Sequence, residues 1–262
     1  MKRTMLITGA SAGLGAALAR EYAQRGWDLV LLARREARLE ALAAELTTEH
    51  GTACRVIAAD LFSESAVPDL MTALGGAQVD GLINNAGYGH PGTFLASAWD
   101  DHRRFNHLMS VVPVELTRAL LPAMVDRGFG RVMQVASLAG HMPGSKGHTL
   151  YAAVKAYLIK FSESLNLEME ATGVHVSALC PGFVLTEFHD VNGTREGMNT
   201  LPKFMVMDAD VCAALAADAL EANKSVFISG RINRFLAALN RWMPWLGRKV
   251  MNSGSGKYRK SD

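Results

Sequence analysis

Short apolar runs recur along this chain, and between most of them apolar residues return at helical spacing. The runs are continuously hydrophobic, which is typical of strands that are covered on both faces. The pattern therefore predicts an α/β fold in which a parallel sheet lies between two layers of helices. The predicted strands are Met5–Thr8, Leu29–Ala33, Arg55–Ala58, Gly81–Asn84, Arg131–Ala136, Val174–Leu179 and Val226–Ser229.

Neither an internal repeat nor a low-complexity block divides the chain, so residues 1–252 are expected to form a single domain. A polar, flexible tail is expected over 253–262. Two segments depart from the rhythm of strands and helices. Residues 183–207 are rich in Met, Phe and Gly and follow the C-terminal end of a strand, where open α/β sheets place their ligands, so they are a candidate substrate lid. Residues 231–251 are amphipathic and basic.

Composition restricts the class of protein. With 49% apolar and 20% charged residues, the chain has an ordinary globular composition. The net charge is +2, and the basic residues are spread over the body with some excess after Ala222, a distribution that does not indicate a nucleic-acid-binding surface. Cys54, Cys180 and Cys212 lie far apart, so neither a metal site nor a disulfide framework is expected. The first apolar run ends at Thr8, which is too short for an export signal, and we expect a cytoplasmic protein.

A glycine-rich turn follows the first predicted strand. Gly9 allows a tight turn, Gly13 allows the backbone to approach a ligand, and Gly15 allows close contact between helix and strand. The helix that follows offers free N–H groups to anionic oxygens. Strand, glycine turn and helix together predict a nucleotide site, and the alternative is a merely tight turn.

The end of the second predicted strand indicates which dinucleotide is bound. An acid there hydrogen-bonds the ribose 2′-hydroxyl of NAD, whereas a basic residue accepts the 2′-phosphate of NADP. This strand ends at Arg34-Arg35, and no acid lies between Asp28 and Glu36. NADP(H) is therefore preferred over NAD(H), with Arg34 as the main phosphate ligand and Arg35 in support. The alternative is that one of the two arginines only begins the next helix in solvent.

Tyr151 and Lys155 open a long helical pattern, and their i, i+4 spacing places phenol and ammonium on one face. A neighbouring ammonium stabilises phenolate, so we expect the pKa of Tyr151 to fall toward neutrality and make the tyrosine a usable acid or base. Ser137 ends the preceding strand and is placed to hydrogen-bond a reacting oxygen.

In combination, these residues resemble the short-chain dehydrogenase/reductase family. The resemblance covers about Lys2 to Thr186, and its motifs occur in the family's order. They are Thr8-Gly9-x-x-x-Gly13-x-Gly15, Asp60-Leu61, Asn84-Asn85-Ala86-Gly87, Ser137, Tyr151-x-x-x-Lys155, and Pro181-Gly182 with Thr186.

The resemblance implies one Rossmann-type, doubly wound parallel sheet, NAD(P) bound over it, and hydride transfer between nicotinamide and a carbonyl or alcohol. It implies Tyr151 as general acid/base, Lys155 as the residue that binds ribose and lowers the tyrosine pKa, and Ser137 as the group that orients the carbonyl. It also implies homodimers or homotetramers formed through the helices at 99–124 and 151–171. Including the residues chosen above, the cofactor-binding set is Gly9, Ser11, Gly13, Leu14, Gly15, Arg34, Arg35, Asp60, Leu61, Asn85, Ala86, Gly87, Tyr151, Lys155, Pro181, Gly182, Val184 and Thr186.

The chain departs from the family pattern in two places. The family usually carries an asparagine in the long helix after the fourth strand, where it completes a water-mediated proton relay. Counting along this chain reaches Met109, whose thioether cannot donate a hydrogen bond, so either Ser110 or Asn106 substitutes or the relay is weakened. Ser137 also precedes Tyr151 by fourteen positions, one more than is usual, which is expected to reshape the substrate loop without displacing either end.

The Met and Phe residues of the candidate lid favour a lipophilic ketone or aldehyde as substrate. The leading hypothesis is an NADPH-dependent carbonyl reductase. Its alternatives are an NAD(P)-linked alcohol dehydrogenase that works oxidatively, and a non-catalytic NADP-binding regulator, which only Met109 supports. The segment 231–251 covers the substrate pocket or packs on a second subunit, and contact with a membrane surface is the less favoured alternative.

Overall fold

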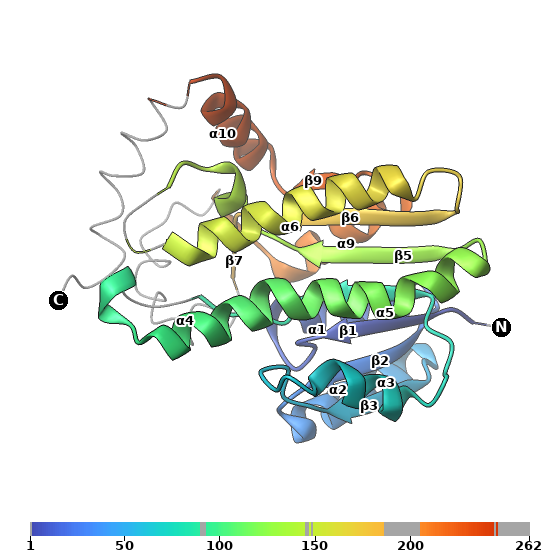
Figure 1. The fold of residues 1–262 in the computed structure, drawn as a ribbon. Helices are drawn as coiled ribbons and strands as arrows, with labels where there is room; N and C mark the ends of the chain where they lie inside the picture. Colours follow the sequence, from blue (N-terminus) through green and yellow to red (C-terminus); the bar gives the residue numbers. More distant parts are fainter. Residues whose placement is uncertain are drawn as a thin grey trace.

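The computed structural model describes residues 2–89, 93–144, 147, 149–185, 205–243 and 245. Its core is a seven-stranded, entirely parallel sheet in the order β3-β2-β1-β4-β5-β6-β9 (Figure 1). All seven predicted strands are confirmed, and their ends differ from the prediction by one residue or less. They are β1 Thr4–Thr8, β2 Asp28–Ala33, β3 Cys54–Ala58, β4 Gly81–Asn84, β5 Gly130–Val135, β6 Val174–Cys180 and β9 Val226–Ile228.

Successive residues of each strand enter opposite faces of the sheet, and both faces are buried. In β1, Met5 and Ile7 pack toward one helix layer and Leu6 packs toward the other. This is why the strands are continuously apolar in the sequence. The first layer contains α1 Gly13–Gln24, α2 Glu36–His50 and α9 Ala209–Glu221, and the second contains α3 Ala66–Leu74, α5 Val112–Asp126 and α6 Thr149–Glu168.

The longest helical stretch joins α4, Trp99–Asn106, to α5 through one π-helical segment, His107–Val111. It is long and apolar enough to cross a membrane by length and composition alone. Leu116 and Leu120, however, are buried against the sheet, as expected for the core helix of a globular fold. The remaining elements are η1 Phe94–Ala96, η3 Leu138–His141, α10 Arg231–Trp242 and the two-stranded parallel pair β7 Phe183–Val184 with β8 Val206–Met207.

Because the strands are parallel, their C-terminal ends meet at one edge of the sheet. Strand order reverses between β1 and β4, the kind of crevice where open α/β sheets bind ligands. The buried Thr8 ties these two strands together there. Its hydroxyl donates to Ile83 O at 3.3 Å and accepts from the backbone N–H groups of Asn85 and Ala86, both at 3.0 Å.

Replacement of Thr8 by Val keeps the shape of the side chain but removes three hydrogen bonds. The Ala86 N–H loses its partner, whereas the Asn85 N–H and Ile83 O still bond each other at 3.1 Å. We expect Thr8→Val to lower the free energy of unfolding by roughly 2–4 kcal/mol, measured by urea unfolding. Thr8→Ser keeps the hydroxyl and is the matched control. Equal losses in both variants would mean that packing of the methyl group, and not hydrogen bonding, makes Thr8 important.

Candidate active site

The glycine turn has the backbone that its sequence predicts. Gly9 and Gly13 adopt φ values of +68° and +56°, a region that side chains disfavour. A Cβ on Gly15 would overlap the carbonyl oxygen of Gly9 and the amide of Asn85. The turn therefore tolerates no side chain at Gly15, and it brings the start of α1 directly onto the end of β1.

The N-terminus of α1 is open to an anion. The helix begins at Gly13, Ala12 makes no side-chain cap, and the first turn holds no acid. Free N–H groups and the positive end of the helix dipole therefore face the crevice. This arrangement fits a pyrophosphate.

The arginines that follow β2 lie in different places. The Nε and Nη2 atoms of Arg35 donate to Ser11 Oγ at 3.2 and 3.1 Å, so Arg35 lies on the glycine turn. The Arg34 guanidinium lies 5.8 Å from the ring centroid of Phe62, in the loop after β3. Both side chains are exposed. The sequence predicts Arg34 as the main phosphate ligand, whereas the structure brings Arg35 into contact with the turn.

The loop after β3 is ordered by Asp60, whose Oδ1 accepts from the Phe62 N–H at 3.1 Å. The side chain of Leu61 is buried in the core beside α3. Leu61 can therefore contact the adenine of a bound dinucleotide only through its backbone.

The loop after β4 serves the fold as well as the crevice. The Asn85 amide donates to the carbonyl oxygens of Thr8 and Gly9 at 3.0 and 3.2 Å, which fixes the glycine turn against β4. Ala86 takes part through its N–H to Thr8. A Cβ on Gly87 would lie 2.9 Å from Met109 Sδ. The sequence does not predict this structural role of the Asn85 side chain, because a motif shows which residues occur and not which hydrogen bonds they make.

Ser137, Tyr151 and Lys155 converge at the ends of β5 and α6. Ser137 Oγ accepts from the Ala139 N–H at 3.1 Å, which fixes it at the start of η3, and it is hydrogen-bonded to the Tyr151 side chain. Lys155 Nζ lies 5.7 Å from the ring centroid of Tyr151 and donates to Val135 O at 2.6 Å. The fourteen-residue spacing therefore leaves Ser137 and Tyr151 in contact.

Burial determines the electrostatics of this group. It lowers the pKa of Lys155 to about 8. Burial also raises the pKa of Tyr151, and the hydrogen bond to Ser137 opposes it. The expectation that Lys155 lowers the tyrosine pKa is therefore not met in this structure. The physical reason is that the ammonium is directed at the Val135 carbonyl, while both groups lose solvent.

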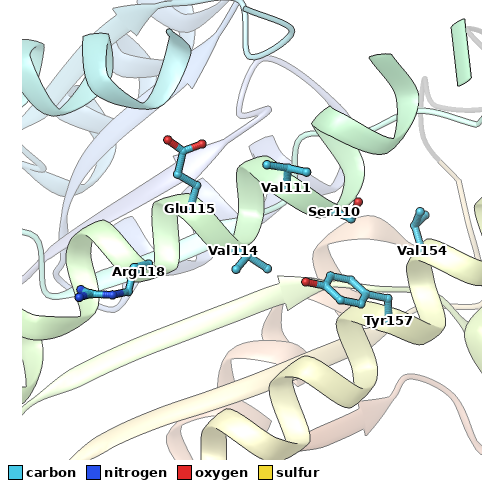
Figure 2. A pocket seen from close by; sticks show the side chains of 7 residues that line it. All are labelled: Ser110, Val111, Val114, Glu115, Arg118, Val154 and Tyr157. Carbon is cyan, nitrogen blue, oxygen red and sulfur yellow. The ribbon is translucent and has the colours of Figure 1, made fainter. Parts of the chain in front are cut away.

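The position expected for the relay asparagine is apolar. Met109 is buried with Phe105 and Val154, beside Tyr151. Ser110 does not replace it, because its hydroxyl donates to Asn106 O at 2.6 Å. Figure 2 shows Ser110 on the side of the long helix that faces Tyr157 of α6, where both residues line a groove.

The end of β6 closes the site from the other side. Pro181 O accepts from the Leu138 N–H at 2.8 Å, which links β6 to the segment that carries Ser137. Gly182 is pressed against Asn233 of α10, and the buried Val184 lies in β7. Thr186 and most of the candidate lid, 186–204, lie outside the described residues.

The sequence model of the family described as short chain dehydrogenase matches residues 3–197. The chain belongs to the short-chain dehydrogenase family. It is similar to oxidoreductase UcpA of Escherichia coli (strain K12), with 36% identity over 187 residues that make up 70% of each chain.

Solved structures of this family match nearly the whole chain. A short-chain dehydrogenase from Sphingobium yanoikuyae in complex with NADPH is 34% identical, with a TM-score of 0.81 over 95% of this chain and 94% of that one. The bulky-bulky ketone specific alcohol dehydrogenase from Comamonas testosteroni is 30% identical, with a TM-score of 0.78 over 94% of each chain. The chain is accordingly an oxidoreductase with the Rossmann-type nucleotide-binding fold of this family.

The cofactor of short-chain dehydrogenases, NAD(P), fits the described crevice. Gly9 and Gly15 leave backbone where side chains would block it, and the start of α1 offers uncapped N–H groups to a pyrophosphate. Tyr151 and Lys155 lie in α6, near the C-terminal end of β5, at the same edge of the sheet as the glycine turn after β1. The described residues contain no cluster of His, Cys, Asp and Glu able to hold a metal ion.

Lys155 is expected to destabilise the apo protein at neutral pH. A fall of its pKa from 10.5 to about 8 corresponds to about 3 kcal/mol, present in full below pH 8, where the folded protein holds a charged, buried ammonium. Between pH 8 and 10.5 the unfolded chain binds the extra proton, so stability rises with pH.

Urea unfolding of wild type and Lys155→Met at pH 7 and pH 10 tests this. The variant should gain stability relative to wild type at pH 7, and much of that gain should disappear at pH 10. Lys160→Met, at an exposed position on the same helix, should show no such pH dependence. A stability difference between Lys155→Met and wild type that stays constant with pH would contradict a lowered Lys155 pKa.

Proposed function

We propose that the protein is a cytoplasmic, NADPH-dependent reductase that transfers hydride to the carbonyl carbon of a lipophilic ketone or aldehyde. The observation that carries the proposal is the contact between Ser137 and Tyr151, with Lys155 on the same helix face, at the strand edge that also holds the glycine turn. A protein that only binds a nucleotide has no physical need for this group.

Each of the three side chains has a separate task in this reaction. Tyr151 donates its phenolic proton to the carbonyl oxygen, and burial suits this role because it keeps the phenol protonated before the reaction. Ser137 holds the same oxygen through its hydroxyl. Lys155 binds the ribose. When bound, the nicotinamide supplies the hydride.

The preference for NADPH is supported by Arg34 and Arg35, which follow β2 where an acid would favour NAD. Arg35 already donates to Ser11 Oγ, so guanidinium and hydroxyl together offer a site for a 2′-phosphate beside the glycine turn. Cation–π contact with Phe62 holds Arg34 near the same edge. The Sphingobium yanoikuyae relative was solved with NADPH.

A lipophilic substrate is supported by the apolar surroundings of the catalytic group. Met109, Val154 and Phe105 pack beside Tyr151, and Phe183 is partly exposed after β6. A pocket wall of Met and Phe adapts to apolar groups of different shapes. The Comamonas testosteroni relative is specific for bulky-bulky ketones.

The second candidate function is a non-catalytic NADP-binding regulator, and Met109 favours it. The thioether cannot pass a proton toward Lys155, and the Ser110 hydroxyl is engaged by Asn106. Tight NADPH binding without turnover of any carbonyl substrate would establish this alternative.

We also propose that the protein assembles as a homodimer or homotetramer through the long helix and α6. A groove between them is lined by Val111, Val114, Val154 and Tyr157, with Glu115 and Arg118 at its end (Figure 2). Val111 and Tyr157 are half exposed in the single chain. Their burial against the same helices of a second copy would remove apolar surface from water.

Tyr151→Phe is expected to lower kcat for NADPH-dependent carbonyl reduction by about 10²–10⁴-fold while leaving NADPH affinity nearly unchanged, because the lost hydroxyl acts in the transition state. NADPH consumption with lipophilic ketones and aldehydes, together with a binding titration, measures both. Tyr157→Phe, on the same helix but in the groove, is the matched control and should keep full activity. Loss of NADPH binding in Tyr151→Phe would contradict the assigned role.

Arg34→Ala and Arg35→Ala are each expected to weaken NADPH much more than NADH, because only NADPH presents a 2′-phosphate. A charge-assisted contact of this kind contributes roughly 1.5–3 kcal/mol, or about 10- to 100-fold in the dissociation constant. Comparing the two substitutions also shows which arginine dominates. Lys160→Ala, far along α6, controls for loss of charge, and equal weakening of both cofactors would refute the assignment.

A further inference from the structure

Helix α10 packs on the body of the protein through small and amide side chains. Asn233 and Ala237 are buried, and the Asn233 amide donates to Ser229 O at 2.7 Å. The Asn240 amide donates to His141 O at 2.6 Å, which fastens the helix to η3. These residues lie three or four apart, so they define the face of α10 that meets the body.

The aromatic side chains of α10 point away from the protein. Phe235 is 65% and Trp242 is 81% exposed, and Trp245 just beyond the helix is 59% exposed. Phe235 and Trp242 lie seven residues apart, two turns along the outward face. Figure 1 shows α10 standing off the β9 side of the sheet. The apolar stripe expected to cover the substrate pocket includes Phe235, Leu239 and Trp242. Leu239 is partly buried, but both aromatic residues of the stripe face outward.

Arginines flank these aromatics. Arg234 and Arg241 also lie seven residues apart, each beside one of the outward aromatics, and Arg231 precedes Phe235 by one turn. Within the part of the chain that the structure describes, none of the three forms a salt bridge. Three guanidinium groups and large apolar surfaces are thus presented together.

The distribution of charge along the chain is strongly uneven here. Residues 222–261 hold nine Lys and Arg and no Asp or Glu, whereas residues 1–221 hold 18 Lys and Arg against 24 Asp and Glu. The net charge of +2 therefore hides an acidic body and a basic C-terminal region. A partner for α10 must accept aromatic rings and carry negative charge.

We propose that α10 docks on the surface of an anionic lipid bilayer. Phe235, Trp242 and Trp245 enter the zone between headgroups and acyl chains, where aromatic rings are favoured. Arg231, Arg234 and Arg241 remain at headgroup level and contact lipid phosphates. Contact of α10 with the same helix of a second copy would instead bring six arginines together without an acid to pair them.

Co-sedimentation with vesicles tests the proposal. The full-length protein should bind phosphatidylcholine–phosphatidylglycerol vesicles, bind pure phosphatidylcholine vesicles weakly, and be released by salt. Arg234→Gln/Arg241→Gln should weaken binding to the anionic vesicles by roughly 25-fold, about fivefold for each arginine. Phe235→Ala/Trp242→Ala should weaken it by at least about tenfold, because buried apolar area is lost.

Matched controls distinguish a specific loss of docking through α10 from misfolding and from a general change in net charge. Trp99→Ala removes a 69% exposed aromatic from α4, and Arg103→Gln/Lys160→Gln removes two exposed charges elsewhere, so both should bind vesicles like the wild type. Far-ultraviolet circular dichroism checks that every variant is folded.

Equal binding of all variants, or no preference for anionic vesicles, would overturn the proposal. If the wild type fails to sediment with vesicles, the mass of the assembly in solution decides between the alternatives. A smaller assembly for Phe235→Ala/Trp242→Ala than for wild type would show that a second copy covers α10. None of these results depends on the reductase activity.

Discussion

The hydrogen bonds between Thr8 and the loop after β4 hold the site together. Strand order reverses between β1 and β4, so the crevice opens between the loops that follow these two strands. Beyond the strand ends, the backbone pairing of the sheet no longer joins the two loops. The Thr8 hydroxyl and the Asn85 amide bridge that gap from both sides. The glycine turn is held by this bridge and by the N–H groups of Gly9 and Ala10, which donate to Leu32 O of β2 at 2.7 and 3.2 Å.

Whereas the Thr8 and Asn85 hydrogen bonds stabilise the fold, the buried Lys155 destabilises it. Its ammonium is buried, bonded to a backbone carbonyl, and kept without a carboxylate partner among the described contacts. Folding tolerates this group because the large apolar core on both faces of the sheet supplies far more stabilisation than one desolvated charge removes. A strained electrostatic position of this kind is typical of sites that do chemistry.

The fold was predictable because the strands carry a redundant signal: every residue of Met5–Thr8 is apolar or buried, and the same holds in the neighbouring strands. The glycine turn and the Ser137–Tyr151–Lys155 group were predictable because their chemistry requires fixed spacing. Properties that depend on contacts between distant parts of the chain were not predictable. Motif order did not tell which arginine meets Ser11, whether burial or Lys155 sets the direction of the tyrosine pKa, or which side of α10 faces the body, because each depends on residues distant in sequence.

The segment between η3 and α6 has both of its ends fixed. The Leu138 N–H is hydrogen-bonded to Pro181 O, and a side chain on Gly140 would overlap the backbone of α6. These two constraints keep η3 from shifting along that helix. Tyr151 is fixed in turn by α6. Evolution can therefore lengthen or shorten the chain between His141 and Thr149 at little cost to folding. This interval is therefore the natural position at which to vary loop length when engineering a new substrate range.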